Sequence, residues 1–213
     1  MKLLLFIFSI AIFSESALAL PKTERQELFN GATKRLKDSG IEARAPKAGD
    51  RFPDLVIQNR SVHKRLQDGM LLFIVYRGGW CPFCVGQLKE IEKRLTELNN
   101  HNVQVIAISP ETSTELAKTK RKSNLSMELV SDLNYKLLRK LNLVFKVEEK
   151  VLQEYKSIGL DLAQSQGNEN GELPVPATYL IDQKGRIIYS FVDADYSKRA
   201  NLDDVFTKIK SLK

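Results

Sequence analysis

Apolar residues along the chain fall into short continuous runs that are separated by segments with a helical repeat. The runs at residues 70–76 (MLLFIVY) and 103–109 (VQVIAIS) have the length and β-branched content typical of buried strands. Residues 126–132 predict a short third strand. Residues 177–192 predict two more strands around a turn at 183–185.

Helical spacing of apolar residues predicts helices at residues 23–38, 85–100, 112–122, 134–143 and 201–212. In the first, apolar side chains gather near one side, with Thr23 as the expected N-cap and Glu24 in the first turn. The segment 39–55 is rich in Gly and Pro and predicts an extended connector. The pattern weakens over 144–171, which ends in a polar loop.

The order of these elements predicts an α/β fold with one central mixed β-sheet, flanked by helices on both faces, and an extra N-terminal helix. Ligands of such sheets usually gather at the carboxyl ends of strands. No internal repeat or low-complexity tract divides the chain, so we expect a single domain over residues 20–213.

Residues 1–19 have the layout of a secretory signal peptide that is cleaved after Ala19: Lys2, an apolar run, a polar break and a small-residue ending. The alternative, an uncleaved anchor, is disfavoured because the eleven apolar residues from Leu3 to Phe13 would span only about 16 Å of a hydrocarbon core of roughly 30 Å. We therefore expect an exported protein, periplasmic in location, with no stable membrane insertion after cleavage.

The net charge of +7 comes from Lys and Arg scattered among acidic residues. A nucleic-acid surface would concentrate basic residues beside aromatic ones, and only short runs such as KTKRK at residues 118–122 occur. The charge pattern predicts no nucleic-acid partner.

The segment YRGGWCPFC, at residues 76–84, contains both cysteines and the sole tryptophan of the chain. It follows a buried strand and precedes a predicted helix, so Cys81 and Cys84 are expected on a turn into a helix N-terminus. A zinc site is disfavoured because only two histidines accompany the two cysteines, and neither lies near them in sequence. A disulfide enclosing so short a loop would remove only about 1.9 kcal/mol of chain entropy, a weak staple for a domain this size.

A redox role explains the pair better. A thiol at a helix N-terminus faces unpaired N–H groups and the positive end of the helix dipole, which lower its pKa. In Cys-x-x-Cys pairs the first cysteine is normally the more exposed and attacks, and the second resolves the mixed disulfide. Cys81 is therefore the expected nucleophile and Cys84 the resolving cysteine.

Four further residues are candidates for positioning a substrate. Arg77 is the charged residue nearest the pair and is suited to stabilise a thiolate, although an exposed loop arginine fits the pattern equally well. Trp80 either shields the site or packs in the core. Val175 and Pro176 precede a strand almost a hundred residues later, where an X-Pro bond is sometimes cis.

At these residues the chain resembles the thioredoxin-fold proteins of the alkyl hydroperoxide reductase/thiol-specific antioxidant (AhpC/TSA) group, in particular peroxiredoxin-like members with a GGWCPFC-type motif. The resemblance runs through KAGDRFPDL, the strand and motif at 71–84, VQVIAISPE, LVSDLNYKLLRKLNLVF, LPVPATYLIDQKGRI and FVDADYSKRA. It implies a thioredoxin-like fold and antioxidant-type thiol chemistry without a cofactor.

The departures from that group bear on the reaction. Its peroxidases use Pro-x-x-x-Thr-x-x-Cys with a distant arginine, and here those positions hold Arg77, Cys81, Cys84 and Pro176, so three of the four residues differ.

The residues at these positions resemble thioredoxin instead, because Trp80, Cys81 and Cys84 match its W-C-x-x-C motif and Pro176 matches its cis-proline. This resemblance implies a cis Val175–Pro176 bond and a Val175 backbone that binds a substrate chain. The buried acid of thioredoxin is missing, because its position holds Val75. The segment 195–199 also matches the AhpC/TSA group. Its sequence is consistent with a loop that lines the site and equally with a solvated turn.

Three functions remain open at this point. The first is an exported thiol-disulfide oxidoreductase that cycles Cys81 and Cys84 between dithiol and disulfide, with a protein disulfide as substrate. The second is a thiol peroxidase that reduces hydroperoxides through a sulfenic acid. Both need a thiol reductant, such as a thioredoxin-like protein or a small thiol. The third is an inactive thioredoxin-like binding module with a structural disulfide.

Overall fold

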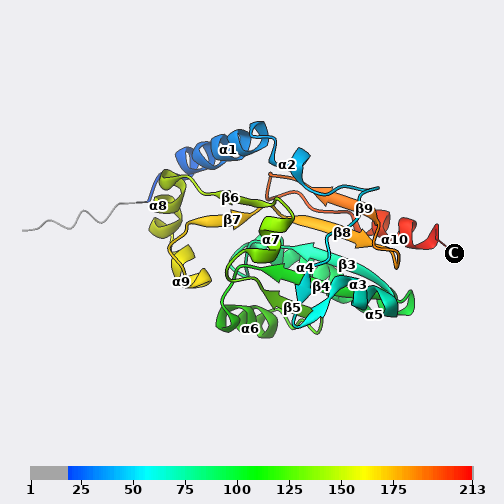
Figure 1. Cartoon of the computed structure of the whole chain (residues 1–213). Coiled ribbons are helices and arrows are strands. Elements are labelled where there is room, and N and C mark those ends of the chain that lie inside the picture. The colour runs from blue at the N-terminus through cyan, green and yellow to red at the C-terminus, as the bar shows by residue number, and fades with distance from the viewer. Residues whose placement is uncertain (1–18, 213) are drawn as a thin grey trace, which may run out of the picture.

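A five-stranded mixed sheet forms the centre of the molecule in a computed structural model that describes residues 19–212 (Figure 1). Its strands lie in the order β5-β4-β3-β8-β9. Their bounds are β3 (Met70–Val75), β4 (Val103–Ser109), β5 (Glu128–Ser131), β8 (Ala177–Ile181) and β9 (Ile187–Val192). The strands β3, β4 and β5 are parallel, and β8 and β9 are antiparallel to their neighbours.

Two smaller sheets and eleven helical segments complete the described chain. The small sheets pair β1 (Val56–Ile57) with β2 (Arg60–Ser61) and β6 (Val144–Lys146) with β7 (Glu172–Pro174). The helices are α1 (Lys22–Asp38), α2 (Ile41–Arg44), α3 (Val62–Arg65), the 3-10 turn η1 (Leu66–Asp68), α4 (Pro82–Lys93), α5 (Leu95–Asn100), α6 (Ser113–Lys122), α7 (Lys136–Lys140), α8 (Glu149–Ser157), α9 (Leu162–Gln166) and α10 (Leu202–Lys210).

Alternation along β3 divides its side chains between two cores. Leu72, Ile74 and Tyr76 face the side covered by α4, α5 and α10. Leu71 and Phe73 face the side covered by α7 and the segment from α2 to η1. Because all of these side chains are fully buried, β3 is the central strand that the continuous apolar run predicts.

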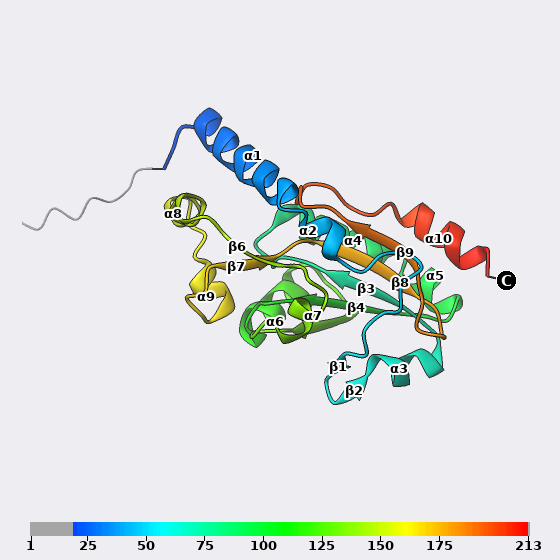
Figure 2. The ribbon, with the colours of Figure 1, turned by 45° about the horizontal axis from the view of Figure 1, so that its top comes forward.

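A third, smaller cluster lies beyond the sheet, where α1 and α8 pack beside the β6-β7 ribbon (Figure 2). Helix α1 has no fully buried residue. It lies along the outside of the molecule, against α8 and α2. It therefore covers a neighbouring region and does not form part of the main core.

The strands and helices predicted from sequence are present, with corrections. The helix after the cysteines is broken at Arg94 into α4 and α5. Thr23 does not cap α1, because the helix already begins at Lys22 and the N–H of Arg25 bonds the carbonyl of Pro21. The connector 39–55 contains α2, and the weakly patterned segment 144–171 contains β6, α8 and α9.

The predicted signal peptide falls outside the described residues except for its last position, Ala19. Among the helices of residues 19–212, none combines the length and the apolar character needed to cross a bilayer.

Candidate active site

The two cysteines lie where β3 passes into α4, at the strand end that the sequence predicts. The N–H of Tyr76 continues the ladder to Ile108, and the N–H of Cys81 closes a turn onto the carbonyl of Gly78. Cys81 is the N-cap residue of α4, and Cys84 lies in its first turn. Cys81 therefore sits at the positive end of the helix dipole.

Gly79 allows the turn to approach α6 closely. A Cβ at this position would lie 1.8 Å from the hydroxyl oxygen of Thr119. The N–H of Gly79 donates to the carboxylate of Glu111 at 2.8 Å. Any side chain at position 79 would therefore push the turn away from α6 and disturb the hydrogen bond to Glu111.

The two thiols are free and have opposite acid-base character. A hydrogen bond from the Cys84 thiol, together with the positive charges of Arg77 and Arg199, lowers the pKa of Cys81 to about 6 against the opposing effect of burial. Burial, followed by the hydrogen bond to Cys81, raises the pKa of Cys84 well above its usual range. These two shifts favour the thiolate at Cys81 and the protonated thiol at Cys84.

Both sulfurs are inaccessible, which the sequence did not predict. Cys81 is 1 % exposed and Cys84 is fully buried. Cys81 is thus the more exposed of the two by a very small margin, and neither thiol is open to solvent. The turn that carries the two cysteines is packed against Arg77, which contacts the rings of Trp80 and Tyr196.

Arg77 lies inside the protein with its guanidinium among aromatic rings. Its carbon Cζ is 4.4 Å from the centre of the Tyr196 ring and 4.9 Å from that of Trp80. Nη2 donates to the hydroxyl of Tyr155 at 2.7 Å, and Nε has no hydrogen-bond partner. No carboxylate within residues 19–212 forms an ion pair with Arg77. The titratable groups that interact with its charge are Tyr155 and the two thiols. Of the two alternatives, the buried position beside the thiols is the one observed.

Arg199 is a residue of the site to which sequence reasoning assigned no role. Its Nη2 donates to the sulfur of Cys84 at 3.1 Å. It belongs to the segment 195–199, which follows β9 and so returns to the edge of the sheet where β3 ends. The segment lines the site, and the match of its sequence to the AhpC/TSA group was the signal that pointed to it.

Val175 and Pro176 lie in the chain between β7 and β8, without the expected geometry. No peptide bond within residues 19–212 is cis, so the expectation of a cis Val175–Pro176 bond is wrong. The chain keeps an extended course here because β7 pairs with β6 and the N–H of Val175 donates to the carbonyl of Leu143 at 2.8 Å. That N–H is already satisfied and is not free to bind a substrate chain.

Trp80 packs between two apolar clusters, the one on the α4 face of the sheet and the one under α8. Its ring lies 6.1 Å from that of Tyr155, and its Nε1 has no hydrogen-bond partner. Both roles considered from sequence therefore apply, because the ring packs in the core and also covers the guanidinium of Arg77.

Glu111 supplies a buried acid at the end of β4, on the strand beside the one that carries Val75. Only 2 % of it is exposed, and it accepts hydrogen bonds from Ser109 at 3.0 Å and from Thr119 at 3.4 Å. Its position could not be read from the motif, because the contact depends on β3 pairing with β4. Within the described residues, no group of three or more potential ligands is placed to hold a metal.

The comparisons with known proteins agree with this fold. The model of the AhpC/TSA family matches residues 48–190, more than half of the chain. No curated protein matches the sequence.

Solved structures with a similar fold include three peroxiredoxin-type proteins, each at low sequence identity. The peroxidoxin BcpB of Mycobacterium tuberculosis has a TM-score of 0.59 at 15% identity, covering 78% of this chain and 98% of that one. A cysteine-to-serine mutant of peroxiredoxin 6 of Arenicola marina has a TM-score of 0.58 at 16% identity, with 78% and 73% covered. The reduced 2-Cys peroxiredoxin of Plasmodium vivax has a TM-score of 0.59 at 15% identity, with 78% and 82% covered.

Proposed function

We propose, from the premise that the chain belongs to the AhpC/TSA family of thiol-dependent oxidoreductases, that it is a thiol peroxidase in which Cys81 attacks the hydroperoxide and Cys84 resolves the product. The observation that carries this proposal is the difference in pKa between the two thiols. The pKa of Cys81 is lowered to about 6, mainly by the hydrogen bond from Cys84, whereas burial raises that of Cys84. A thiolate is the form that attacks.

The reaction balances with the groups present and two external thiol groups. The Cys81 thiolate attacks the terminal oxygen of a hydroperoxide, an S–O bond forms as the O–O bond breaks, and the alkoxide leaves as an alcohol after it takes a proton from water. Cys84 then loses its proton and attacks the sulfenic sulfur, which expels hydroxide and closes the disulfide. The hydroxide takes the proton and leaves as water. Two external thiols, or one dithiol, return two electrons to the Cys81–Cys84 disulfide and become a disulfide themselves.

The arginines are suited to the charge that develops in the first step. Negative charge builds on the leaving oxygen beside Cys81, and positive donors held in a site of low dielectric stabilise such charge strongly. Arg77 lies beside both thiols, and Arg199 contacts Cys84. Together they stand in for the threonine and the distant arginine that the sequence lacks at the positions where peroxidases of this group have them.

Burial favours a small oxidant over a protein disulfide. A protein substrate must bring its disulfide within bonding distance of the Cys81 sulfur, which is 1 % exposed. The resemblance to thioredoxin assigns substrate binding to the backbone of Val175, but its N–H already donates to the carbonyl of Leu143. The disulfide-reductase alternative therefore needs the site to open, whereas a peroxide needs only a path the width of a small molecule.

We also propose that the protein acts after export, in the periplasm, where residues 1–19 direct it and a thiol reductant serves it. The reductant, whether a thioredoxin-like protein or a small thiol, needs access to the disulfide. This part of the proposal rests on the sequence of the N-terminus.

Two assays on the purified protein test the proposed function. Peroxide consumption with dithiothreitol as reductant is compared with reduction of insulin disulfides, for the natural protein and for Cys81→Ser and Cys84→Ser. We expect rapid peroxide turnover, none with Cys81→Ser, and a single turnover before reduction with Cys84→Ser. Turnover that survives Cys81→Ser would make Cys84 the nucleophile. Insulin reduction without peroxide turnover would support the disulfide reductase, and inactivity in both assays the binding module.

A further inference from the structure

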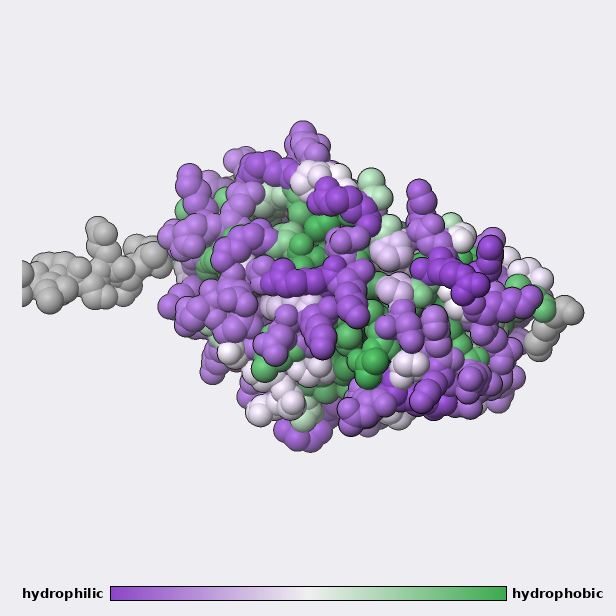
Figure 3. Space-filling model, viewed as in Figure 1, coloured by the Kyte–Doolittle hydropathy of each residue, from purple (hydrophilic) through white to green (hydrophobic). Residues whose placement is uncertain are grey.

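A largely apolar cavity of about 400 Å³ reaches Arg77 of the candidate site and lies between α1, the β6-β7 ribbon and α8. Small-molecule sites commonly measure roughly 300–1,000 Å³, so this volume suits one alkyl chain. Figure 3 shows apolar residues in a hollow between α1 and β6 that is rimmed by hydrophilic side chains. The apolar lining comes from several elements and includes Phe29, Leu36, Val147, Leu173 and Pro176.

Helix α1 forms one wall of the cavity, and ion pairs link it to α8 and to the chain after β9. Arg25 pairs with Glu154 and Arg35 with Glu148 on the α8 side, at 2.5 and 2.8 Å. Lys37 pairs with Asp193, which follows β9, at 2.9 Å. The apolar residues of α1 are only partly buried, and the cavity beneath the helix is space that side chains do not fill.

A buried cation without a carboxylate partner also lines the cavity. Arg77 is 3 % exposed and its Nε lacks a hydrogen-bond partner. On the same lining, the guanidinium of Arg35 is already neutralised by two hydrogen bonds to Glu148. Arg44 and Lys146, the other cations of the lining, are exposed to solvent. Arg77 is therefore the buried position that favours a negatively charged group, because an uncompensated buried charge is costly.

We propose that this cavity binds a single-chain fatty carboxylate, with its alkyl tail under α1 and its carboxylate at Arg77. The apolar lining recognises the tail, and the guanidinium recognises the head through charge-assisted hydrogen bonds. This ligand is not a reactant, and its binding needs neither thiol to react.

The redox state of the pair controls the affinity for the carboxylate, an element of the inference that rests on the proposed function. In the dithiol form the thiolate of Cys81 provides the negative charge near Arg77. Disulfide formation removes that charge and leaves the guanidinium free for the carboxylate. By linkage, a fatty carboxylate that prefers the disulfide form stabilises that form by the same factor.

Calorimetric titration of the full protein with dodecanoate tests the inference, with dodecanol and butyrate as comparison ligands. We expect one dodecanoate per chain, bound about tenfold more tightly to the disulfide form than to the dithiol form, because one charge-assisted hydrogen bond separates them. Dodecanol should bind at least about tenfold more weakly for the same reason, and butyrate should show no binding. Equal affinity for dodecanol and dodecanoate, or no dodecanoate binding, would overturn the inference.

Two variants locate the site. Ala32→Phe places a ring in the cavity from α1 and should abolish dodecanoate binding, whereas Lys34→Phe, on the exposed side of the same helix, should leave binding unchanged. Arg77→Met should reduce dodecanoate affinity to that of dodecanol. Circular dichroism of each variant excludes unfolding as the cause, and unchanged binding in folded Ala32→Phe would contradict the assignment.

The titration separates this inference from the proposed function. Binding is measured without peroxide, so dodecanoate binding in a protein that consumes no peroxide leaves the cavity assigned and overturns the peroxidase. Peroxide turnover without dodecanoate binding overturns the assignment of the cavity and leaves the proposed peroxidase supported. Equal dodecanoate affinity in the two redox forms overturns the redox control alone.

Discussion

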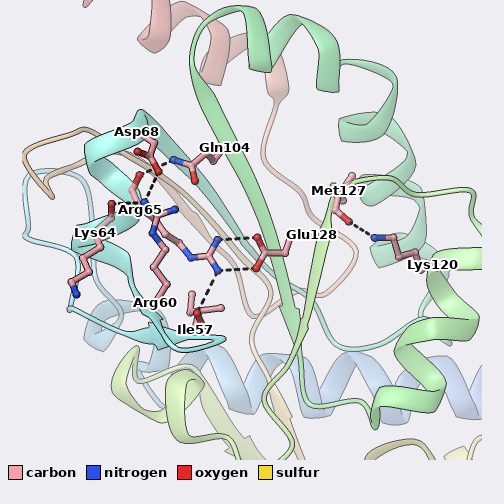
Figure 4. A network of polar contacts seen from close by, with 9 residues as sticks. All are labelled: Ile57, Arg60, Lys64, Arg65, Asp68, Gln104, Lys120, Met127 and Glu128. Atoms are coloured by element: carbon pink, nitrogen blue, oxygen red, sulfur yellow. Dashed lines mark hydrogen bonds and ion pairs between the residues drawn. The ribbon is translucent and has the colours of Figure 1, made fainter.

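Two arginines, Arg65 and Arg77, are buried on different sides of the molecule and differ in how their charges are compensated. Arg65 is held by the carboxylate of Glu128, with its two terminal nitrogens donating at 2.9 and 3.0 Å, and by the carbonyl of Ile57 (Figure 4). Arg77 has a tyrosine hydroxyl, aromatic rings and two sulfurs around it, and no carboxylate partner within the described chain.

The difference distinguishes a structural charge from a functional one. The ion pair between Arg65 and Glu128 links α3 to β5, so the charge of Arg65 stabilises the contact between these two elements. The charge of Arg77 acts on Cys81 instead, where it helps to lower the pKa of the thiol. A buried cation without a carboxylate partner beside a cysteine therefore indicates reactivity, whereas one that is paired with a carboxylate indicates stability.

The largest expected effect is on catalysis, from Arg77→Met. The substitution removes one positive donor from the leaving oxygen and raises the pKa of Cys81. We expect the second-order rate with hydrogen peroxide at pH 7 to fall about a hundredfold, the cost typical of losing one such donor. Stopped-flow mixing with peroxide measures the rate.

Arg77→Lys is the matched control for that experiment. It keeps the charge but loses the planar fork that stacks on the rings, so it should recover part of the rate. A rate in Arg77→Met equal to that of the natural protein would show that the Arg77 charge has no role in the reaction.

Arg65→Met should affect stability and leave catalysis unchanged. The substitution leaves the Glu128 carboxylate, 31% exposed, without its partner, and we expect the free energy of unfolding to fall by about 2 kcal/mol. Urea denaturation measures it. The double variant Arg65→Met/Glu128→Leu should recover most of the loss. A peroxide rate reduced as strongly as in Arg77→Met would remove the distinction between the two arginines.

Arg199→Met should have the smallest effect. Arg199 makes one hydrogen bond to the Cys84 sulfur, so we expect disulfide closure to slow about threefold, as for the loss of one modest hydrogen bond. The rate of closure after a peroxide pulse gives the measurement, with Arg199→Lys as control. A faster or unchanged closure would mean that Arg199 does not assist the resolving cysteine.

The sequence predicts the main sheet well because its strands are continuous apolar runs. The bounds predicted for β4 are those observed, and β3 ends one residue earlier than predicted. The region from β6 to α9 was missed because its apolar residues face a separate small cluster and not the main core, so no long periodic pattern appears. The N-cap of α1 was missed because Pro21 caps it without a side-chain bond.

The site was predictable as far as local sequence determines it. The position of Cys81 before a helix follows from the motif itself. Arg199 and Glu111 could not be placed that way, because each reaches the site only through strand pairing that joins distant segments. The Val175–Pro176 geometry was expected by analogy with thioredoxin, and the pairing of β7 with β6 gives that segment a different course.

The pH dependence of peroxide reduction tests the central claim most directly, with the fluorescence of the sole tryptophan, Trp80, as reporter. The account predicts a rate that is maximal at neutral pH and falls as the pH drops through about 6, because protonation of Cys81 then removes the nucleophile. A rate that instead rises only near pH 8.5, the ordinary range of a cysteine thiol, would contradict an activated Cys81 thiolate.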